Sequence, residues 1–529
     1  MYSIKNLLSM KSGFYLKLSS VMIVLALSWV PCKAQGVFAD VNGDGAATIR
    51  DVTDLIDYLL SGDASGTGTA TWYKGYLSAR DYGAVGDGVT DDTEALERLF
   101  AAAAERHLAI YFPSGTYMIR RPLTIMSGME IYGDGNSSVL KKFPAAWHKL
   151  TDAVNTGVYN NDEDHTITIK VDGISGYHVG DHCYISYSTN PFDPANAKAR
   201  YCSYGEIAAI NEVPVSQGKY EIKFKSAYDS EKHGVVYRHA AGTFLSTSFP
   251  LLRSWSFKDE CVNVYIHDIC LDGNRQTNGP TYNGVTYEPM EWANGCIHFD
   301  AYGTSKVNGI SYDKHSYNHI VQRCKIINSS FDGISDQGEG GLYVKDCTIE
   351  NCAMHGVHMG TVFSNAIISG NTMTGNGVRG AGVFFCQDVT NAIIDGNIIS
   401  SFNHGCSDEE YGTAAAYNII RNNQFNDITS YVFDFLTGDY YSEGGGLQIS
   451  GNTISGLRAA MFAGYSIDNI VLLNNKVTSI TQSPSSLINL SSCGNVIIVG
   501  NTLPYGSSIS RPVSSSGTSN VINTSNSWN

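Results

Sequence analysis

Short apolar segments alternate with polar turn residues along the C-terminal half of the chain, and this pattern predicts stacked β-strands. A motif of asparagine, any residue and an apolar residue returns every 23 to 29 residues, with cysteine replacing asparagine in the first two rounds. The rounds begin at Cys324, Cys347, Asn371, Asn397, Asn423, Asn452, Asn475 and Asn501. One strand per round cannot bury its own apolar face but stacked rounds can, so the period predicts a parallel β-solenoid.

The asparagine is expected at one fixed corner of each coil, where its amide can bond the coils above and below. Cysteine at that corner is a small apolar substitute. Residues 149–255 lack the motif and contain alternating strands, which predicts an inserted β-subdomain. The Ser-, Asn- and Thr-rich residues 505–529 are expected to form a frayed or capping tail.

The segment DYGAVGDGVTDDTEAL from Asp81 to Leu96 leads into a helical pattern that ends near His107, followed by the strand and turn FPSGTY. This opening resembles the pectate-lyase-like superfamily. The resemblance implies an all-β, right-handed parallel β-helix over residues 76–529, with a helix capping its first coil. The superfamily includes lyases, polygalacturonases, other glycosidases, epimerases and phage tailspikes, so the resemblance does not specify a reaction.

Composition and charge narrow the class of protein. The chain has 529 residues, a net charge of −15 and a pI near 5.3, which disfavours a nucleic-acid binder. Residues 1–34 have the pattern of a signal peptide, with basic residues, an apolar run and an expected cleavage site after Ala34. No second apolar run in the sequence is long enough to span a membrane. We expect a periplasmic or secreted monomer.

Residues 36–62 predict a separate calcium-loop module, joined by a linker at 63–75. Oxygen ligands occupy loop positions 1, 3, 5, 9 and 12, which are Asp40, Asn42, Asp44, Thr48 and Asp51. The module resembles half of a dockerin, which implies bound Ca²⁺. Dockerins carry two such repeats and this chain has one, so a calcium-stabilised appendage is favoured over docking to a cohesin.

Four consecutive coils predict a row of side chains on the outside of one sheet. If Ile297, Ile334, Val357 and Val383 face the core, strand alternation makes the following residues face outward. The outward residues are His298, Ser335, His358 and Phe384. Exposed imidazoles and an aromatic ring suit sugar stacking and proton transfer, whereas the alternative is an ordinary polar exterior.

A basic cluster lies between the first two of these strands. It comprises Lys314, His315, Tyr317 and His319, followed by Arg323 and Lys325. A local positive patch can attract an acidic polysaccharide despite the net negative charge, and the alternative is a solvated loop. We predict a base among Lys314, His315 and His358, and an acid at Tyr317 or a histidine. The predicted substrate-binding residues are His298, Arg323, Ser335, Asp336 and Phe384.

The leading hypothesis is a polysaccharide lyase that cleaves a uronate-containing polymer, a glycosaminoglycan such as chondroitin sulfate or a pectin, by β-elimination. A glycoside hydrolase using Asp300, Asp336 or Glu339 is the first alternative, and a non-catalytic carbohydrate-binding solenoid is the second. Asp332, directly before Gly333, is assigned to a turn. Asp- and Asn-rich turns offer another place for Ca²⁺, which would neutralise a uronate carboxylate.

Overall fold

The computed structural model describes residues 75–528, except 155–165, 187–202, 227–237, 255–260, 276–280, 283–284, 287–294, 300–304, 308–309, 313–315, 361–362, 387–388, 409–416, 437–444 and 508. The predicted signal peptide, calcium loop and linker therefore lie outside the described residues. No helix in the described part of the chain is long and apolar enough to cross a membrane.

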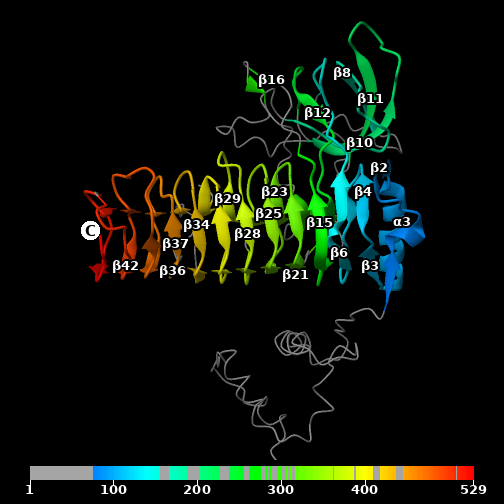
Figure 1. The fold of residues 1–529 in the computed structure, drawn as a ribbon. Coiled ribbons are helices and arrows are strands. Elements are labelled where there is room, and N and C mark those ends of the chain that lie inside the picture. Colours follow the sequence, from blue (N-terminus) through cyan, green and yellow to red (C-terminus); the bar gives the residue numbers. More distant parts are fainter. Residues whose placement is uncertain are drawn as a thin grey trace, which may run out of the picture. The chain divides into compact units, whose positions relative to one another are not determined.

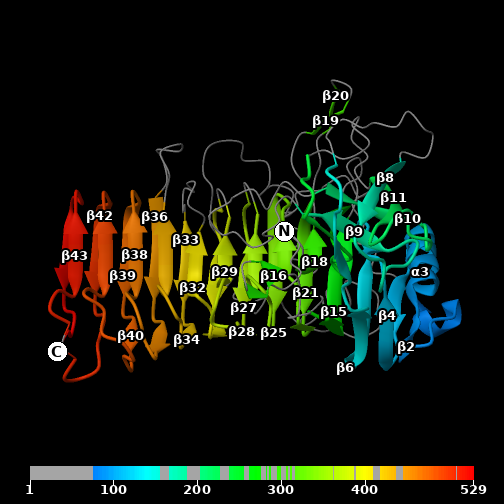
Figure 2. The same ribbon diagram turned by 90° about the horizontal axis from the view of Figure 1, so that it is seen from above.

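The described residues form a parallel β-solenoid whose strands stack in chain order (Figure 1), as the repeat predicted. Eleven strands make one sheet, seen side by side in Figure 2. These strands are β5 (Leu123–Thr124), β13 (Leu252–Ser254), β18 (Gly295–Phe299), β23 (Asp332–Asp336), β26 (Val357–Met359), β29 (Ala381–Phe385), β32 (His404–Asp408), β35 (Phe433–Leu436), β38 (Phe462–Tyr465), β41 (Ile488–Ser491) and β43 (Val513–Ser516).

A second sheet of twenty-three strands supplies the other walls of the coils. Its first part contains β1 (Tyr76–Ser78), β2 (Asp87–Asp91), β3 (Ala109–Phe112), β4 (Gly115–Ile119), β6 (Glu130–Lys142), β14 (Cys261–Val262), β15 (Tyr265–Asp272), β21 (Ser316–Gln322), β22 (Lys325–Ile327), β24 (Gly340–Lys345) and β25 (Thr348–Glu350). Its second part contains β27 (Ile367–Ser369), β28 (Thr372–Thr374), β30 (Ile393–Asp395), β31 (Ile398–Ser400), β33 (Asn418–Arg421), β34 (Gln424–Asn426), β36 (Gly445–Ser450), β37 (Thr453–Ser455), β39 (Asp468–Leu473), β40 (Lys476–Val477), β42 (Gly494–Val499) and β44 (Val521–Thr524).

The repeated asparagine forms the predicted ladder. In each step the side-chain oxygen of one asparagine accepts hydrogen bonds from the backbone and side-chain nitrogens of the preceding one, as Asn423 does from Asn397 at 2.9 Å. The side-chain nitrogen of Asn423 in turn donates to the carbonyl of Ile394 at 2.9 Å. Cys347 occupies the same corner, and its backbone N–H donates to Asn371. Because these groups are buried, the ladder satisfies backbone polar atoms that water cannot reach.

The C-terminal tail adds a coil rather than fraying. β43 and β44 extend the two sheets, and Asn526 continues the ladder by accepting hydrogen bonds from Asn501. The sequence interpretation missed this last round, although Asn526 keeps the motif with Trp528 as its apolar residue, 25 residues after Asn501.

Helix α3 (Thr93–Arg106) packs against the first coil. Its buried residues are spaced on one helical face: Thr93, Ala95, Leu96, Leu99, Phe100 and Ala103. The carboxylate of Asp92 accepts the backbone N–H groups of Val85 and Gly86, so this aspartate fixes the preceding turn. A short 3₁₀ helix, η2 (Ala79–Tyr82), precedes α3.

The inserted subdomain is an antiparallel sheet with its own apolar core. Its strands are β7 (Trp147–Lys149), β8 (Thr166–Val171), β9 (His182–Ile185), β10 (Ser203–Ile210), β11 (Tyr220–Ser226) and β12 (Phe244–Ser246). The sequence placed the insertion at 149–255, whereas β13 already belongs to the solenoid. Two hairpins complete the described strands: β16 (Thr281–Tyr282) with β17 (Val285–Thr286), and β19 (Ser305–Val307) with β20 (Ile310–Tyr312).

Candidate functional site

A row of aligned side chains runs along the outer side of the eleven-stranded sheet. Pairing between neighbouring strands places one residue from each strand in the row, hereafter the outward row: Arg253, His298, Ser335, His358, Phe384, Ser407 and Asp434. The residue before each of these lies in the solenoid core, from Leu252 to Phe433. Because strands alternate their faces, the row points away from the core.

The register of His298, Ser335, His358 and Phe384 matches the sequence interpretation, but the expected exposure of the first three was wrong, and Phe384 is half-buried. His298 is 3% exposed, Ser335 is fully buried and His358 is 4% exposed. Sequence alternation distinguishes inward from outward side chains and says nothing of what packs over the outer side. At one end of the row, for example, His182 of the inserted subdomain lies so close to Arg253 that the positive charge of this arginine helps to lower the pKa of His182.

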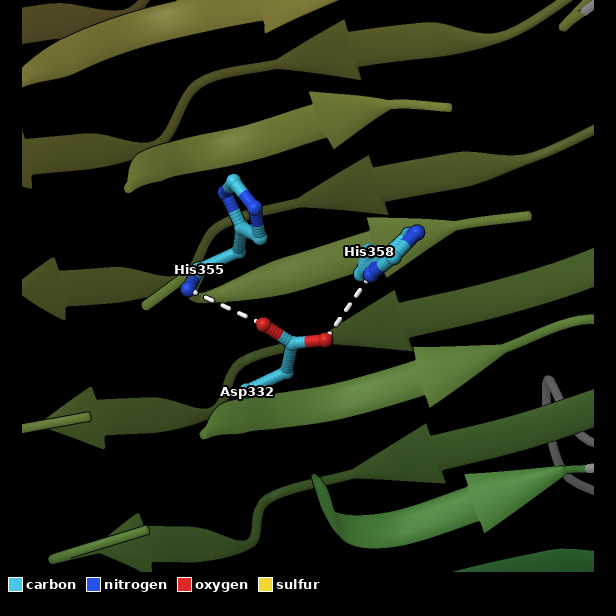
Figure 3. A group of neighbouring side chains, drawn as sticks. All are labelled: Asp332, His355 and His358. Carbon is cyan, nitrogen blue, oxygen red and sulfur yellow. Dashed lines mark hydrogen bonds and ion pairs between the residues drawn. The ribbon is translucent and has the colours of Figure 1, made fainter. Parts of the chain in front are cut away.

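Asp332 links two histidines at the centre of the row (Figure 3). Its Oδ2 atom lies 2.8 Å from Nδ1 of His358, and its Oδ1 atom accepts the backbone N–H of His355 at 3.1 Å. The ring of His355 stacks on Phe384 with 4.0 Å between centroids. Asp332 begins strand β23, so its assignment to a turn was wrong. It orients the His358 imidazole by a charge-assisted hydrogen bond.

The electrostatics of this group favour proton uptake by His358. Burial by itself would lower the pKa of His358, but the charge and hydrogen bond of Asp332 outweigh it and raise the pKa to about 10. Burial raises the pKa of Asp332, and the neighbouring His358 opposes that rise. Burial, together with His358 and His404, holds the pKa of His355 well below its usual range. His355 is therefore neutral while His358 is a strong base.

Hydrogen bonds fix the tautomer of each ring. Nδ1 of His355 accepts the backbone N–H of Ala381 at 3.0 Å, so the neutral ring carries its proton on Nε2. Nε2 of His358 faces Nε2 of Gln337 at 3.3 Å, and the same amide nitrogen donates to Ser335 Oγ. The unprotonated ring can accept a hydrogen bond from this amide at Nε2, which is the state a general base needs, but with a pKa of about 10 the ring is mostly protonated at neutral pH.

The three side chains are close enough to suggest a metal site, but their hydrogen bonds argue against one. Ligand atoms of Asp332, His355 and His358 lie within 4.8 Å of one another. However, His358 Nδ1 is bonded to Asp332, and the Nδ1 lone pair of His355 is used by Ala381. The remaining Nε2 of neutral His355 bears hydrogen and cannot bind a metal. Two nitrogen donors also suit Ca²⁺ poorly, because it prefers oxygen ligands.

The structure separates several residues that the sequence grouped together. Tyr317 lies on β21 in the other sheet and is 37% exposed. Arg323 lies at the corner between β21 and β22, where it binds Asp268 through Nε at 2.8 Å. Lys314, His315, Asp300 and the calcium-loop residues lie outside the described residues. Glu339 is exposed after β23. The roles predicted for these residues stay predictions.

Asp336 belongs to the inward-facing residues of its strand. It pairs in register with Phe299 and Met359, both buried in the core. Its Oδ1 atom accepts the backbone N–H of Gly338 at 2.9 Å, and its Oδ2 atom has no hydrogen-bond partner among the described residues. Burial raises the pKa of Asp336 to about 8, although the Gly338 hydrogen bond and nearby His358 lower it. A carboxyl group in this position is protonated at neutral pH.

Replacing Asp336 with asparagine is expected to stabilise the protein at pH 8 and to change little at pH 4. The pKa of Asp336 is about 8 in the folded protein and 3.8 in the unfolded chain. Its contribution to stability is therefore fully present below pH 3.8 and is lost as pH rises through about 8. The Asp336→Asn side chain cannot ionise, so the gain should reach about 2–4 kcal/mol at pH 8. Urea unfolding at both pH values measures it, with half-buried Asp395→Asn as control. Equal effects at pH 4 and pH 8 would show that ionisation is not the cause.

The sequence interpretation missed Asp332, His355 and Gln337. The His-x-x-His spacing of 355 and 358 was a usable signal, because it places two imidazoles on one strand end. Gln337 carried no such signal. Its position depends on Gly360, where an added Cβ would lie 2.5 Å from Gln337 Oε1. Glycine at 360 thus leaves room for the amide beside His358.

Comparison with known families agrees with this architecture. Residues 76–177 match the family described as rhamnogalacturonase A/epimerase, pectate lyase-like, and residues 305–441 match the right-handed β-helix region. The chain folds as a right-handed parallel β-helix. The resemblance of its opening segment to pectate-lyase-like proteins is thereby confirmed, and both matched regions contain coils of the β-helix.

Individual relatives match over short segments. Glucan 1,3-β-glucosidase of Cochliobolus carbonum is 34% identical over 85 residues, which is 13% of this chain and 11% of that protein. Mannuronan C5-epimerase AlgE1 of Azotobacter vinelandii is 28% identical over 130 residues, 22% of this chain and 9% of the epimerase. The matched segments thus span about a tenth of these relatives.

Solved β-helix structures are similar over more of the chain. The A-module of mannuronan C-5 epimerase AlgE4 from Azotobacter vinelandii has 13% identity and a TM-score of 0.46, covering 85% of this chain and 99% of the module. The Yersinia enterocolitica family 28 exopolygalacturonase has 11% identity and a TM-score of 0.41, covering 84% of this chain and 78% of that one.

Proposed function

We propose that the β-helix is an enzyme that cleaves a uronate-containing polysaccharide by β-elimination at the outward row. The observation that carries this proposal is the Asp332–His358 pair, which places an oriented and strongly basic imidazole on the outer side of the sheet. A linear polymer fits such a sheet, because stacked strands repeat about every 4.8 Å along the solenoid axis. The partial similarity to a glucan glucosidase and a mannuronan epimerase supports a polysaccharide as the substrate.

His358 Nε2 would remove the proton from C5 of a uronate residue. The electron pair then forms the C4–C5 double bond as the C4–O bond breaks. Asp332 stabilises the imidazolium that forms, because its carboxylate is hydrogen-bonded to Nδ1 of the same ring. The Nε2–H group of neutral His355 would donate a hydrogen bond to the departing oxygen, which then takes its proton from water. Buried surroundings strengthen each of these interactions.

The substrate carboxylate needs hydrogen-bond donors beside the base. The amide of Gln337 and the hydroxyl of Ser335 lie next to His358 and would bind the carboxylate, which stabilises the enolate that forms on it. His298, two strands away in the row, would bind an acidic group farther along the polymer. Arg323 receives no role here, since it is ion-paired on the other sheet.

Elimination by His358 predicts that the reaction rate rises with pH across the neutral range. Only the unprotonated ring accepts a proton, so kcat/KM should increase about tenfold per pH unit below the His358 pKa. Ultraviolet absorbance of the unsaturated uronate measures this directly. Asp332→Asn removes the charge that holds the pKa high, so its profile should level off at a pH about 1–3 units lower, with a reduced maximum.

Asp395→Asn, at a half-buried aspartate bonded to Arg421, is the matched control and should keep the wild-type profile. A wild-type rate independent of pH between 6 and 9 would contradict a base at His358. New reducing ends without absorbance would instead support a hydrolase.

A further inference from the structure

A second titratable group lies on the outward row beyond the proposed reaction centre. Asp434 on β35 is three strands from His358, with Phe384 and Ser407 between them. The separation is therefore about 14 Å along the solenoid axis. The side chain of Asp434 is 20% exposed. Asp434 can therefore meet a ligand that lies along the sheet.

The surroundings of Asp434 leave its negative charge largely uncompensated among the described residues. Nδ1 of His404 lies 3.5 Å from Oδ2, and the ring of Tyr431 lies 6.3 Å from that of His404. Burial lowers the pKa of His404, so the imidazole is neutral at physiological pH. The row neighbours Ser407 and Ala463 are uncharged. Asp408, the nearest acid on β32, is a further negative group and binds the backbone N–H of Leu436.

We propose that Asp434 forms a sugar-binding subsite that accepts an uncharged sugar residue and rejects a uronate. This inference rests on the proposed function and narrows its substrate. A carboxylate can accept hydrogen bonds from the hydroxyl groups of an uncharged sugar, whereas a uronate at the same place would bring two like charges together. Basic residues line the other end of the row, at Arg253, His298 and His358.

The row therefore selects a heteropolymer in which uronates are interspersed with uncharged sugars. A homopolymer of uronates would place a carboxylate against Asp434 in every binding register. An unsulfated polymer of alternating uronate and N-acetylated amino sugar has registers that avoid this contact. The predicted glycosaminoglycan type of substrate is thus preferred over the pectin backbone of consecutive uronates.

The preference should depend on pH. Burial raises the pKa of Asp434 to about 6, so the carboxylate is ionised at pH 7.5 and protonated at pH 5. Repulsion of a uronate is then strong at pH 7.5 and weak at pH 5. The ordinary uronate carboxyl stays ionised at both values.

The test measures binding rather than turnover, using hexasaccharides and isothermal titration calorimetry in an inactive His358→Gln background. The probes are a hyaluronan hexasaccharide, which alternates uronate and N-acetylated amino sugar, and a homopolymeric galacturonate hexasaccharide. We expect hyaluronan to bind at least tenfold tighter at pH 7.5. Adding Asp434→Asn should reduce this ratio below threefold by improving galacturonate binding, and should remove the pH dependence of the ratio.

Ser514→Ala, at the same row position on β43, is the matched control and should keep the parent ratio. A ratio unchanged by Asp434→Asn, with both probes bound, overturns the subsite and leaves the proposed function intact. Failure of both probes to bind overturns the proposed function together with the subsite.

Discussion

The His358→Gln variant is expected to lose kcat/KM by a factor of about 10²–10⁴ while keeping its fold, because a positioned acid–base group contributes that much. A glutamine amide can still donate to Asp332 but cannot take up the proton from C5. The substitution changes an outward residue, and its neighbours Val357 and Met359 keep their places in the core. Glutamine is preferable to alanine, since alanine would leave the buried Asp332 without its partner.

Asn489→Ala is the control for this experiment. Asn489 lies in the same outward row, five strands from His358 and outside the proposed centre. Its loss should leave kcat/KM within about twofold of wild type, within the range of a neutral substitution away from the site. Steady-state assays report activity and circular dichroism reports the fold. Full activity of a folded His358→Gln protein would exclude His358 as the base.

The Asn423→Ala variant is expected to show the largest loss of stability, about 3–6 kcal/mol. Asn423 accepts two hydrogen bonds from Asn397, and it donates to Ile394 and Asn452. Truncation leaves buried donors and acceptors without partners, and each costs about 1–3 kcal/mol. Asn423→Cys should cost less, since cysteine occupies the equivalent corner at positions 324 and 347.

Gln424→Ala provides the control, because Gln424 is the exposed next residue on the same corner. Its effect on the free energy of unfolding should stay within about 0.5 kcal/mol. Urea unfolding compares the variants. If Asn423→Ala lowers the free energy of unfolding by less than about 1 kcal/mol, the ladder aligns the coils but adds little to their stability.

The architecture was predictable because every coil of the solenoid repeats the same short strands and the same corner residue. The spacing of asparagine and apolar residues predicts the ladder, and the alternation along the strands of the other sheet predicts the outward row. Burial of His298 and His358 did not follow, since alternation along a strand carries no information about parts of the chain that pack over it.

The candidate site was predictable only in part for a related reason. His358 was found because its strand has a clear register. Asp332 was assigned to a turn because aspartate before glycine is common in turns, and its partner is 26 residues away in the sequence. Asp336 was assigned to substrate binding, but it faces the core at the end of its strand. Sequence distance hides such contacts between coils, whereas the strand pairing reveals them.

The most direct test of the central claim is the fate of water in the products. Wild-type protein is incubated briefly with uronate-containing polysaccharides in H₂¹⁸O, and the new reducing ends are reduced at once with borohydride so that their C1 oxygen cannot exchange with water. Mass spectrometry then examines the new chain ends. Elimination forms an unsaturated uronate without adding water, so the account predicts products that lack ¹⁸O and that disappear with His358→Gln. Products carrying one ¹⁸O atom per cleaved bond would contradict elimination and establish hydrolysis.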